Sequence, residues 1–358
     1  MSGAALVLLF SSLLTVFSTW ILPLRAGLNF SAGFALVSLV LLSPVSALWL
    51  VVTTLTTVCL VRWYRFRKLR GAVALLYSLL LVSLLLASRE ATGVFWVGGA
   101  YFTLRHLHVV GDWWMGRIRI PTIGEYFRYS LFLPVLMAGP IHRLDNFQRQ
   151  VSRQRLSASN FFVGAERTLI GLTQVVVISS WALRRLQMLG ENYMHGFSPF
   201  LKDWVDGGFE WLQLYFSFAG LTSVAVGLSL MMGLRIEENF DRPWAARNLI
   251  DFWSRWHMTL SHWCRDYVFY SVTASTRMPA LGLLLAMLAM GLWHDTSLYY
   301  VLWAVWQSLG ILLTHLVLRF YSEPRPGHFW RWVGPLSVIF WLTLTRPVVQ
   351  LVLELLDT

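Results

Sequence analysis

His257 and His294 are the side chains in this sequence most suited to chemistry, because histidine titrates near neutral pH and both lie in strongly apolar surroundings. His257 belongs to FWSRWHMTLSHWCRDY at 252–267, which mixes large rings with arginine, aspartate and hydroxyl side chains. His294 ends an apolar run that begins at Leu281. This combination suits general-base activation of a hydroxyl group better than electron transfer or metal binding, since no bis-His haem spacing is evident.

The segment around His257 also has a purely structural interpretation. If 253–263 is one helix, its apolar face consists of Trp253, Trp256, Leu260 and Trp263. His257 and Ser261 then lie beside that face, whereas His262 lies about 140° from His257 around the helix. An amphipathic, Trp-rich helix is a common interfacial element of membrane proteins. Both interpretations remain open at this point.

His294 and Asp295 form an ionisable pair at the end of an apolar helix. Uncompensated charge in hydrocarbon costs at least about 2.5 kcal/mol, so such a pair indicates a functional site by default. The alternative is a helix end that emerges among lipid headgroups, with Asp295 capping the next helix at Ser297. Asp295 could therefore hold His294 in one tautomer or only cap a helix.

The composition excludes a single soluble globule. Of the 358 residues, 56% are hydrophobic and 13% are charged, whereas soluble domains carry roughly 25% charged residues. Such a chain fits a lipid bilayer, where lipid contacts most of its surface. The formal net charge is +11, but the basic residues are spread over loops, so no nucleic-acid partner is expected. The two cysteines lack the spacing of a disulfide framework or zinc site, so no metal site is expected.

Apolar stretches of membrane-spanning length recur throughout the chain. The first, at 4–22, lacks the basic region and cleavage site of a signal peptide, so a retained helix is expected. Further candidates lie at about 30–61, 71–88, 93–110, 160–183, 208–234, 279–293, 297–319 and 333–356, with a break or kink at Pro44. We expect about nine to eleven transmembrane helices in one all-α polytopic domain over 1–358.

Basic residues predict which loops face the cytoplasm. Five lie within 62–70, directly after a predicted span, so that loop is placed inside. The basic clusters at 117–128 and 143–155 would both be inside, yet only the apolar segment 129–141 separates them. This segment is therefore expected to be re-entrant, broken at Gly139 and Pro140, and to line a cavity near the cytoplasmic side.

Several motifs follow one another in a consistent order. FWSRWHMTLS at 252–261, WCRDY at 263–267 and GLWH at 291–294 are preceded by ENFDRPW at 238–244, YFSFAG at 215–220 and GPIHR at 139–143. Over about residues 95–320 they resemble the signatures of the membrane-bound O-acyltransferase (MBOAT) family. The resemblance is narrowest to its bacterial branch, which holds the membrane proteins of alginate O-acetylation and of teichoic-acid D-alanyl transfer.

The resemblance implies a ring of helices with re-entrant segments around a central funnel and tunnel. It also implies that His294 is the catalytic histidine and that His257 is a second functional residue. Two features depart from the family pattern. Asp295 stands in place of a small residue, and Ser217 and Ser223 stand where acidic residues often occur. Any substrate contact made by those acids cannot be carried over to this chain.

The predicted substrate-binding residues lie within the family motifs or directly after one: Arg143, Trp253, Arg255, Ser261, Arg265, Asp266, Trp293 and Asp295. The three arginines could contact a phosphate of coenzyme A or phosphopantetheine, because guanidinium pairs bidentately with phosphate. Each could instead form a structural ion pair with Asp241, Asp251 or Asp266. An acyl-enzyme on Cys264 or Ser261 has weak support, because neither has a recognisable nucleophile setting.

The resulting hypothesis is an O-acyltransferase of the bacterial cytoplasmic (inner) membrane, surrounded by lipid. It would move an acyl group, acetyl first and D-alanyl second, from acetyl-CoA or an acyl carrier protein to a hydroxyl. The acceptor could be a polysaccharide, a teichoic acid or a relay protein, and no tightly bound cofactor is expected. His294 would act as general base, and His257 would bind the donor or the developing oxyanion.

Two other classes of protein fit part of the pattern. A transporter or flippase of lipid-linked substrates would share the spans, the re-entrant segment and the intramembrane polar residues. It would also predict inverted repeats, which this sequence lacks. A scaffold that recruits soluble partners would not need His294.

Overall fold

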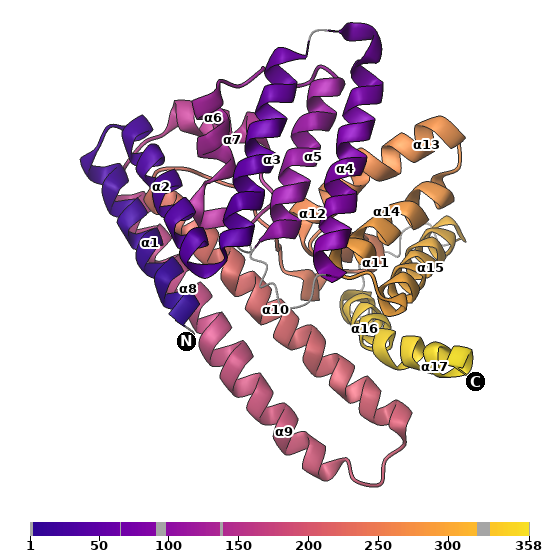
Figure 1. Ribbon diagram of the computed structural model, residues 1–358. Coiled ribbons are helices and arrows are strands. Elements are labelled where there is room, and N and C mark those ends of the chain that lie inside the picture. Colours follow the sequence, from indigo (N-terminus) through magenta and orange to yellow (C-terminus); the bar gives the residue numbers. More distant parts are fainter. Residues whose placement is uncertain (1–2, 65, 91–97, 137–138, 321–329, 358) are drawn as a thin grey trace. The chain divides into compact units, whose positions relative to one another are not determined.

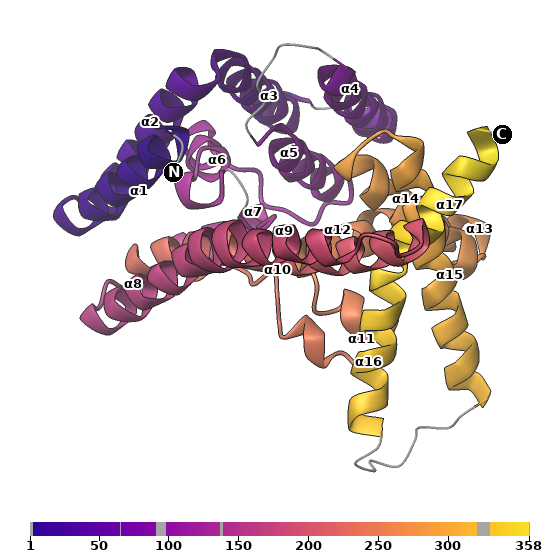
Figure 2. The same ribbon diagram turned by 90° about the horizontal axis from the view of Figure 1, so that it is seen from below.

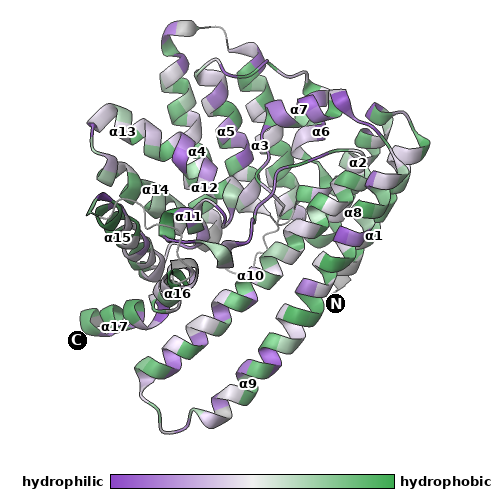
Figure 3. Ribbon diagram, turned by 180° about the vertical axis from the view of Figure 1, so that it is seen from behind, coloured by the Kyte–Doolittle hydropathy of each residue, from purple (hydrophilic) through white to green (hydrophobic). Residues whose placement is uncertain are grey.

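The computed structural model describes residues 3–64, 66–90, 98–136, 139–320 and 330–357, and every regular element in these ranges is a helix (Figure 1). Seven helical segments within them are long and apolar enough to cross a membrane, and two shorter apolar helices lie at 10–21 and 279–294. Hydrophobic residues run along α14 and α15, whereas α7 is mostly hydrophilic (Figure 3). The predicted all-α polytopic membrane fold is confirmed.

The chain divides into two compact units, and the first contains residues 1–171 and 221–237. Its helices are α1 (Gly3–Ile21), α2 (Leu24–Leu42), α3 (Pro44–Trp63), η1 (Arg67–Leu69), α4 (Arg70–Glu90), α5 (Gly99–Trp114), α6 (Ile123–Ser130), η2 (Leu133–Val135), α7 (Leu144–Arg153) and most of α8 (Ala158–Thr173). The apolar stretch around Pro44 forms two helices, because Pro44 starts α3 and the Ser43 hydroxyl accepts the Ser46 amide at 3.3 Å.

The segment 129–141 lies in the first unit and is mostly irregular. Residues 137 and 138 are outside the described part of the chain, and α6 ends at Ser130 and η2 at Val135, both before Gly139. The expected helix break at Gly139 and Pro140 stays a prediction. A Cβ at Gly139 would lie 2.4 Å from Val135 Cα, so this close approach requires glycine. Leu131, Phe132 and Leu136 are buried. The segment is packed within protein, as irregular backbone at membrane depth must be, and its re-entry into the membrane stays a prediction.

The second unit contains residues 172–220 and 238–358. Its elements are η3 (Gln174–Leu183), α9 (Arg184–Tyr193), the larger part of α10 (Pro199–Met231), η4 (Pro243–Ala245), α11 (Leu249–Trp253), α12 (Met258–Cys264), η5 (Arg265–Phe269), α13 (Tyr270–Thr276), α14 (Pro279–His294), α15 (Leu298–Phe320), α16 (Trp330–Thr343) and α17 (Thr345–Asp357). Both η3 and η5 are π-helical, a form that often occurs at functional sites.

Helix α10 runs alongside η3 and α9 in this unit (Figure 1). The Ser179 hydroxyl donates to the Gln213 carbonyl at 2.9 Å, and the Gln213 side chain donates to Gln187 Oε1 at 2.7 Å. These polar bonds between apolar helices fix the rotation of α10. They thereby set which side chains of α10 face the rest of the unit.

Helices α14 and α15 pack side by side and are joined by the short connection 295–297 (Figure 2). Gly291 makes the approach possible, because a Cβ at this position would lie 2.6 Å from the Tyr300 carbonyl oxygen. The close packing places His294, at the end of α14, against the first turn of α15. The His294 and Tyr300 rings stack with centroids 5.6 Å apart.

Residues 253–263, whose apolar face would suit a single helix, do not form one helix. Helix α11 ends at Trp253, and α12 begins only at Met258. His257 between them has φ 42°, a left-handed conformation that interrupts a right-handed helix. The residues that hold this turn come from 239–241 and 251, so local helix periodicity did not reveal it.

Candidate functional site

Hydrogen bonds from the segment that precedes η4 hold the turn that carries His257. The Asn239 carbonyl accepts the Met258 amide at 2.9 Å, and Asn239 Oδ1 accepts the Thr259 amide at 3.3 Å and hydroxyl at 2.6 Å. The Asp241 amide donates to the Arg255 carbonyl at 3.0 Å. The two segments are thus joined on both sides of His257. These bonds stabilise a backbone conformation that costs a non-glycine residue energy.

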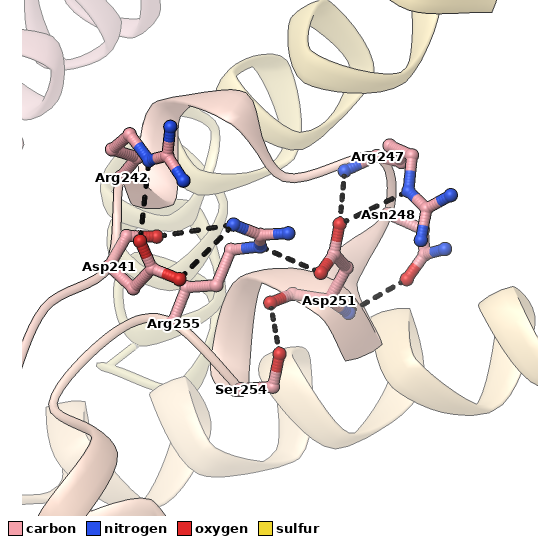
Figure 4. Close-up of polar contacts among 7 residues, drawn as sticks. All are labelled: Asp241, Arg242, Arg247, Asn248, Asp251, Ser254 and Arg255. Atoms are coloured by element: carbon pink, nitrogen blue, oxygen red, sulfur yellow. Dashed lines mark hydrogen bonds and ion pairs between the residues drawn. The ribbon is translucent and has the colours of Figure 1, made fainter.

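Charged side chains reinforce the same turn from outside (Figure 4). Arg255 Nε donates to Asp251 Oδ1 at 2.7 Å, and an Arg255 Nη1 lies 3.6 Å from Asp241 Oδ2. Arg247 also pairs with Asp251, and Asn248 caps α11 by accepting the Asp251 amide at 2.8 Å. Asp251 is partly desolvated, but its hydrogen bonds from the Arg247 amide and from Arg255 lower the pKa of its carboxyl group. It is therefore held ionised in this network.

The His257 ring is buried among aromatic rings, with 3% of the residue exposed. The centroid of Phe218 lies 4.6 Å away and that of Trp293 lies 5.6 Å away. Burial lowers the pKa of His257 well below its ordinary value, and nearby His294 lowers it further. His257 is therefore a neutral imidazole near neutral pH. Such an imidazole can donate one hydrogen bond and accept another.

A pocket of about 180 Å³ in the second unit brings the two histidines together. Its lining comes from α10, the turn at 253–257, α14, α15 and α17: Gly207, Glu210, Trp211, Leu214, Phe218, Trp253, Trp256, His257, Met290, His294, Tyr299, Tyr300, Trp303, Thr345 and Arg346. Both histidines line this pocket, although His294 is exposed and His257 is buried. Trp293 contacts both imidazoles, with centroids 5.6 Å from His257 and 4.8 Å from His294.

A larger cavity of about 830 Å³ adjoins this pocket. Its wall consists of Ile250, Trp253, Ser254, Ser261, His262, Cys264, Arg265, Phe269, Pro279, Ala280, Leu283, Ala286, Met287, Met290, Ile311, Leu312, His315, Leu316 and Arg319. Trp253 and Met290 line both spaces. Its walls are mostly apolar, and the described residues that line it include two arginines and no carboxylate. An elongated ligand with a negative end would suit such a surface.

The predicted site residues have different surroundings. Trp253 lines both cavities, and Ser261 and Arg265 line the larger one. Asp266 pairs with Arg265 at 2.8 Å. Trp293 touches both histidines without lining either cavity.

The remaining predicted residues lie outside both cavity walls. Asp295 is the C-cap residue of α14, and its Oδ1 accepts the adjacent Thr296 amide at 2.7 Å. Whether it caps the next helix or holds the tautomer of His294 stays a prediction. Arg255 is held by Asp241 and Asp251. Arg143 belongs to the first unit, where it precedes α7 and its carbonyl accepts the Phe147 amide at 2.9 Å.

Sequence reasoning missed Glu210 and Arg346, which line the pocket with the histidines and pair with each other. Both residues could have been found from the sequence, because each is a charged residue inside a predicted apolar span. Their partnership was not visible, since it joins α10 to α17.

Other chemistry finds less support at this site. Among the described residues no group of three or more His, Cys, Asp or Glu side chains is arranged to hold a metal ion. Cys264 is buried, and burial raises the pKa of its thiol to about 12, so it is protonated and a poor nucleophile. The arrangement favours a histidine that acts directly on a bound hydroxyl.

Comparison with known proteins agrees with the motifs. The probable alginate O-acetylase AlgI of Pseudomonas aeruginosa is 30% identical over 255 residues, covering 69% of this chain and 48% of that protein. The teichoic acid D-alanyltransferase of Streptococcus thermophilus is 26% identical over 253 residues, covering 62% and 57%. The peptidoglycan O-acetyltransferase of Helicobacter pylori is 31% identical over 222 residues, covering 57% and 39%.

The chain thus spans about half the length of the first two of these relatives and less of the third. The sequence model of the membrane-bound O-acyltransferase family matches residues 48–345, which include every lining residue of the histidine pocket except Arg346. The chain belongs to the membrane-bound O-acyltransferase family.

Proposed function

We propose that this chain transfers an acyl group, acetyl in the first instance, from a thioester on the cytoplasmic side of the bacterial inner membrane to a hydroxyl acceptor. One observation carries the proposal: His294 and His257 line a single pocket that shares two wall residues with a much larger cavity. Two substrates can therefore meet at His294 from different directions. The family and the names of its acetyl-transferring relatives support the same reaction class.

His294 is the general base in this proposal. Its imidazole takes the proton of the acceptor hydroxyl while the oxygen attacks the thioester carbonyl carbon. When the tetrahedral intermediate collapses, the carbon–sulfur bond breaks and His294 donates this proton to the departing thiolate. The products are an ester and a free thiol. A positioned general base contributes typically about 10²–10⁴-fold to the rate.

His257 assists from the wall of the same pocket. As a neutral imidazole it donates a hydrogen bond to the thioester oxygen, which gains negative charge during attack. Its left-handed backbone and the hydrogen bond between Asn239 and Thr259 support a fixed ring orientation before substrate binds. Preorganised donors of this kind are often the largest electrostatic contribution to acyl transfer.

The larger cavity is the proposed path of the donor. Arg265 and Arg319 supply positive charge for the phosphate of coenzyme A or of a carrier protein's phosphopantetheine arm. The apolar walls surround the chain between phosphate and thioester. Arg143 and Arg255, which were also candidates for phosphate binding, have weaker support because neither lines this cavity.

The donor is acetyl-CoA or an acyl carrier protein, and the acceptor lies on a cell-envelope polymer or on a protein that relays the acyl group. The relatives are named for alginate, peptidoglycan and teichoic acid. D-alanyl transfer is the second candidate, because it is the named activity of two relatives.

The test uses the purified full chain with His294→Ala and, as a matched control, His195→Ala, which alters an exposed histidine that lines neither cavity. Each is incubated with radiolabelled acetyl-CoA and then with a carrier protein charged with D-alanine. We expect His294→Ala to lose transfer and His195→Ala to retain most of it. Full acyl transfer in cells by His294→Ala would contradict the enzymatic role and favour a scaffold or a transporter.

A further inference from the structure

Glu210 and Arg346 form a charged edge of the histidine pocket. Glu210 lies within the candidate span Pro199–Met231, and Arg346 lies within Trp332–Leu356. Ionisable residues in such segments are costly, face protein or water-filled cavities, and commonly mark a substrate path. This pair has a place in the pocket but no part in the proton transfer described above.

The geometry leaves Glu210 able to bind a further group. Arg346 Nε lies 3.3 Å from Asp203 Oδ1, and Arg346 Nη1 pairs with Glu210 Oε1. The Glu210 side chain remains 53% exposed, so its carboxylate can accept hydrogen bonds beyond the one from Arg346. Helix α10 packs closely against the junction of α16 and α17 at Gly207, where a Cβ would lie 3.0 Å from the Thr343 carbonyl oxygen and 3.2 Å from Arg346 Cβ. The edge is therefore built on two closely packed helices.

The size and walls of the pocket restrict what can lie against this edge. A cavity of roughly 150 Å³ accommodates benzene, so the 180 Å³ here suffices for one six-membered ring. Trp211, Tyr299 and Trp303 supply aromatic faces, on which the C–H groups of a pyranose can pack. The carboxylate and guanidinium together accept from and donate to the hydroxyl groups around such a ring.

The charge at this edge further restricts which sugar rings can bind. Asp203, which does not line the pocket, and Glu210 both pair with Arg346, so these two carboxylates and one guanidinium together carry a net negative charge. A uronate or a phosphate at the acceptor would meet like charge there, which disfavours binding. A neutral sugar would meet only hydrogen-bonding groups.

We propose that Glu210 and Arg346 form the acceptor subsite and bind a neutral sugar ring beside His294. The inference rests on the proposed acyl transfer and names its acceptor class.

The test compares two ligands by saturation-transfer NMR with the full chain in lipid nanodiscs. Methyl β-D-glucopyranoside and methyl β-D-glucopyranosiduronate differ only at carbon 6, which is a hydroxymethyl group in the first and a carboxylate in the second. We expect the neutral glucoside to bind about tenfold more tightly to the wild type. In Glu210→Gln the glucoside should weaken and the uronate should improve, so that the ratio approaches one.

Asp206→Asn is the charge-matched control, because Asp206 lies one turn away on α10, accepts from Gln187 at 3.3 Å and does not line the pocket. The ratio should change little in this variant. Equal binding of the two sugars by the wild type, binding of neither, or equal changes in both variants would overturn the proposal. If Glu210→Gln does not fold, the wild-type ratio alone decides.

The measurement requires no acyl donor and no turnover. Loss of sugar selectivity would therefore contradict the acceptor subsite and leave the role of His294 intact. Acyl transfer by His294→Ala would contradict the proposed reaction and leave the sugar-binding result unchanged.

Discussion

Asn239 holds Thr259 through one side-chain oxygen, which accepts the Thr259 amide at 3.3 Å and its hydroxyl at 2.6 Å. Asn239 is fully buried, and its own carbonyl accepts the Met258 amide at 2.9 Å. These bonds begin α12 immediately after His257. The orientation of the His257 imidazole therefore depends on a side chain that touches neither substrate in the proposed mechanism.

Asn239→Ala should lower both stability and acyl transfer. Loss of a helix-capping acceptor costs about 1–2 kcal/mol, and here it also frees the turn that carries His257. Asn248→Ala is the matched control, because Asn248 caps α11 by the same chemistry. The unfolding temperature should fall by a similar amount in both variants, and kcat should fall more in Asn239→Ala. Equal losses of kcat would contradict the positioning role.

His257→Asn should separate the contribution of the imidazole from that of the left-handed backbone at this position. Asparagine tolerates a left-handed φ of 42°, so this variant should unfold near the wild-type temperature while transferring acyl groups slowly. His257→Val should also lose stability, by roughly 1–2 kcal/mol, because a β-branched side chain is strained in this conformation. Wild-type activity in His257→Asn would remove the imidazole from the mechanism.

Acid should destabilise the wild type through His257. Burial, followed by the proximity of His294, depresses the pKa of His257 in the folded chain below the ordinary 6.5. Below that pH the unfolded chain binds a proton that the folded chain excludes, so stability is lost as the pH falls. The loss from this one group is at most about 1.4 kcal/mol per pH unit.

The measurement is thermal unfolding of the wild type and of His257→Asn between about pH 7.5 and 5.5. Other buried histidines contribute equally to both proteins and cancel in the difference. The wild type should lose more stability than the variant as the pH falls. Parallel curves would show that His257 does not exclude the proton.

Helix ends were largely predictable from local chemistry, whereas the site required contacts distant in sequence. The predicted span 279–293 and α14 (Pro279–His294) nearly coincide, because proline begins the helix and polar residues follow its end. The turn at His257 could not be predicted, since Asn239 and Asp241 hold it from another segment.

The partition of the arginines also depended on the fold. Arg255 and Arg265 occur in adjoining motifs and carry the same charge, so the sequence could not distinguish their roles. In the folded chain Arg255 lies between two aspartates and lines neither cavity, whereas Arg265, which pairs with Asp266, lines the larger cavity from a π-helical turn.

Arg265→Gln and Arg255→Gln should therefore affect different quantities. Loss of a charge-assisted phosphate contact in Arg265→Gln should raise the donor KM about tenfold, and added salt should reduce the difference from the wild type. Arg255→Gln removes an ion pair of 2.7 Å and should lower stability by up to about 1 kcal/mol with little change in donor KM. Steady-state kinetics at two salt concentrations and thermal unfolding distinguish the two. The opposite pattern would assign phosphate binding to Arg255.

Gly291→Ala should separate α14 from α15 and displace His294. The added methyl group would lie 2.6 Å from the Tyr300 carbonyl oxygen, and both partners are helical backbone that cannot rotate away. Overpacking of this kind costs typically about 1–3 kcal/mol. Because His294 follows Gly291 by less than one turn and stacks on Tyr300, kcat should fall together with the unfolding temperature.

Gly190→Ala is the matched control, because nothing lies within 4 Å of a Cβ at this position in α9. Replacing glycine in an open helical position should raise stability by roughly 0.5–1 kcal/mol through the lower entropy of the unfolded chain. Acyl transfer should stay at the wild-type level. If Gly291→Ala retains wild-type kcat, the contact between α14 and α15 does not set the position of the catalytic histidine.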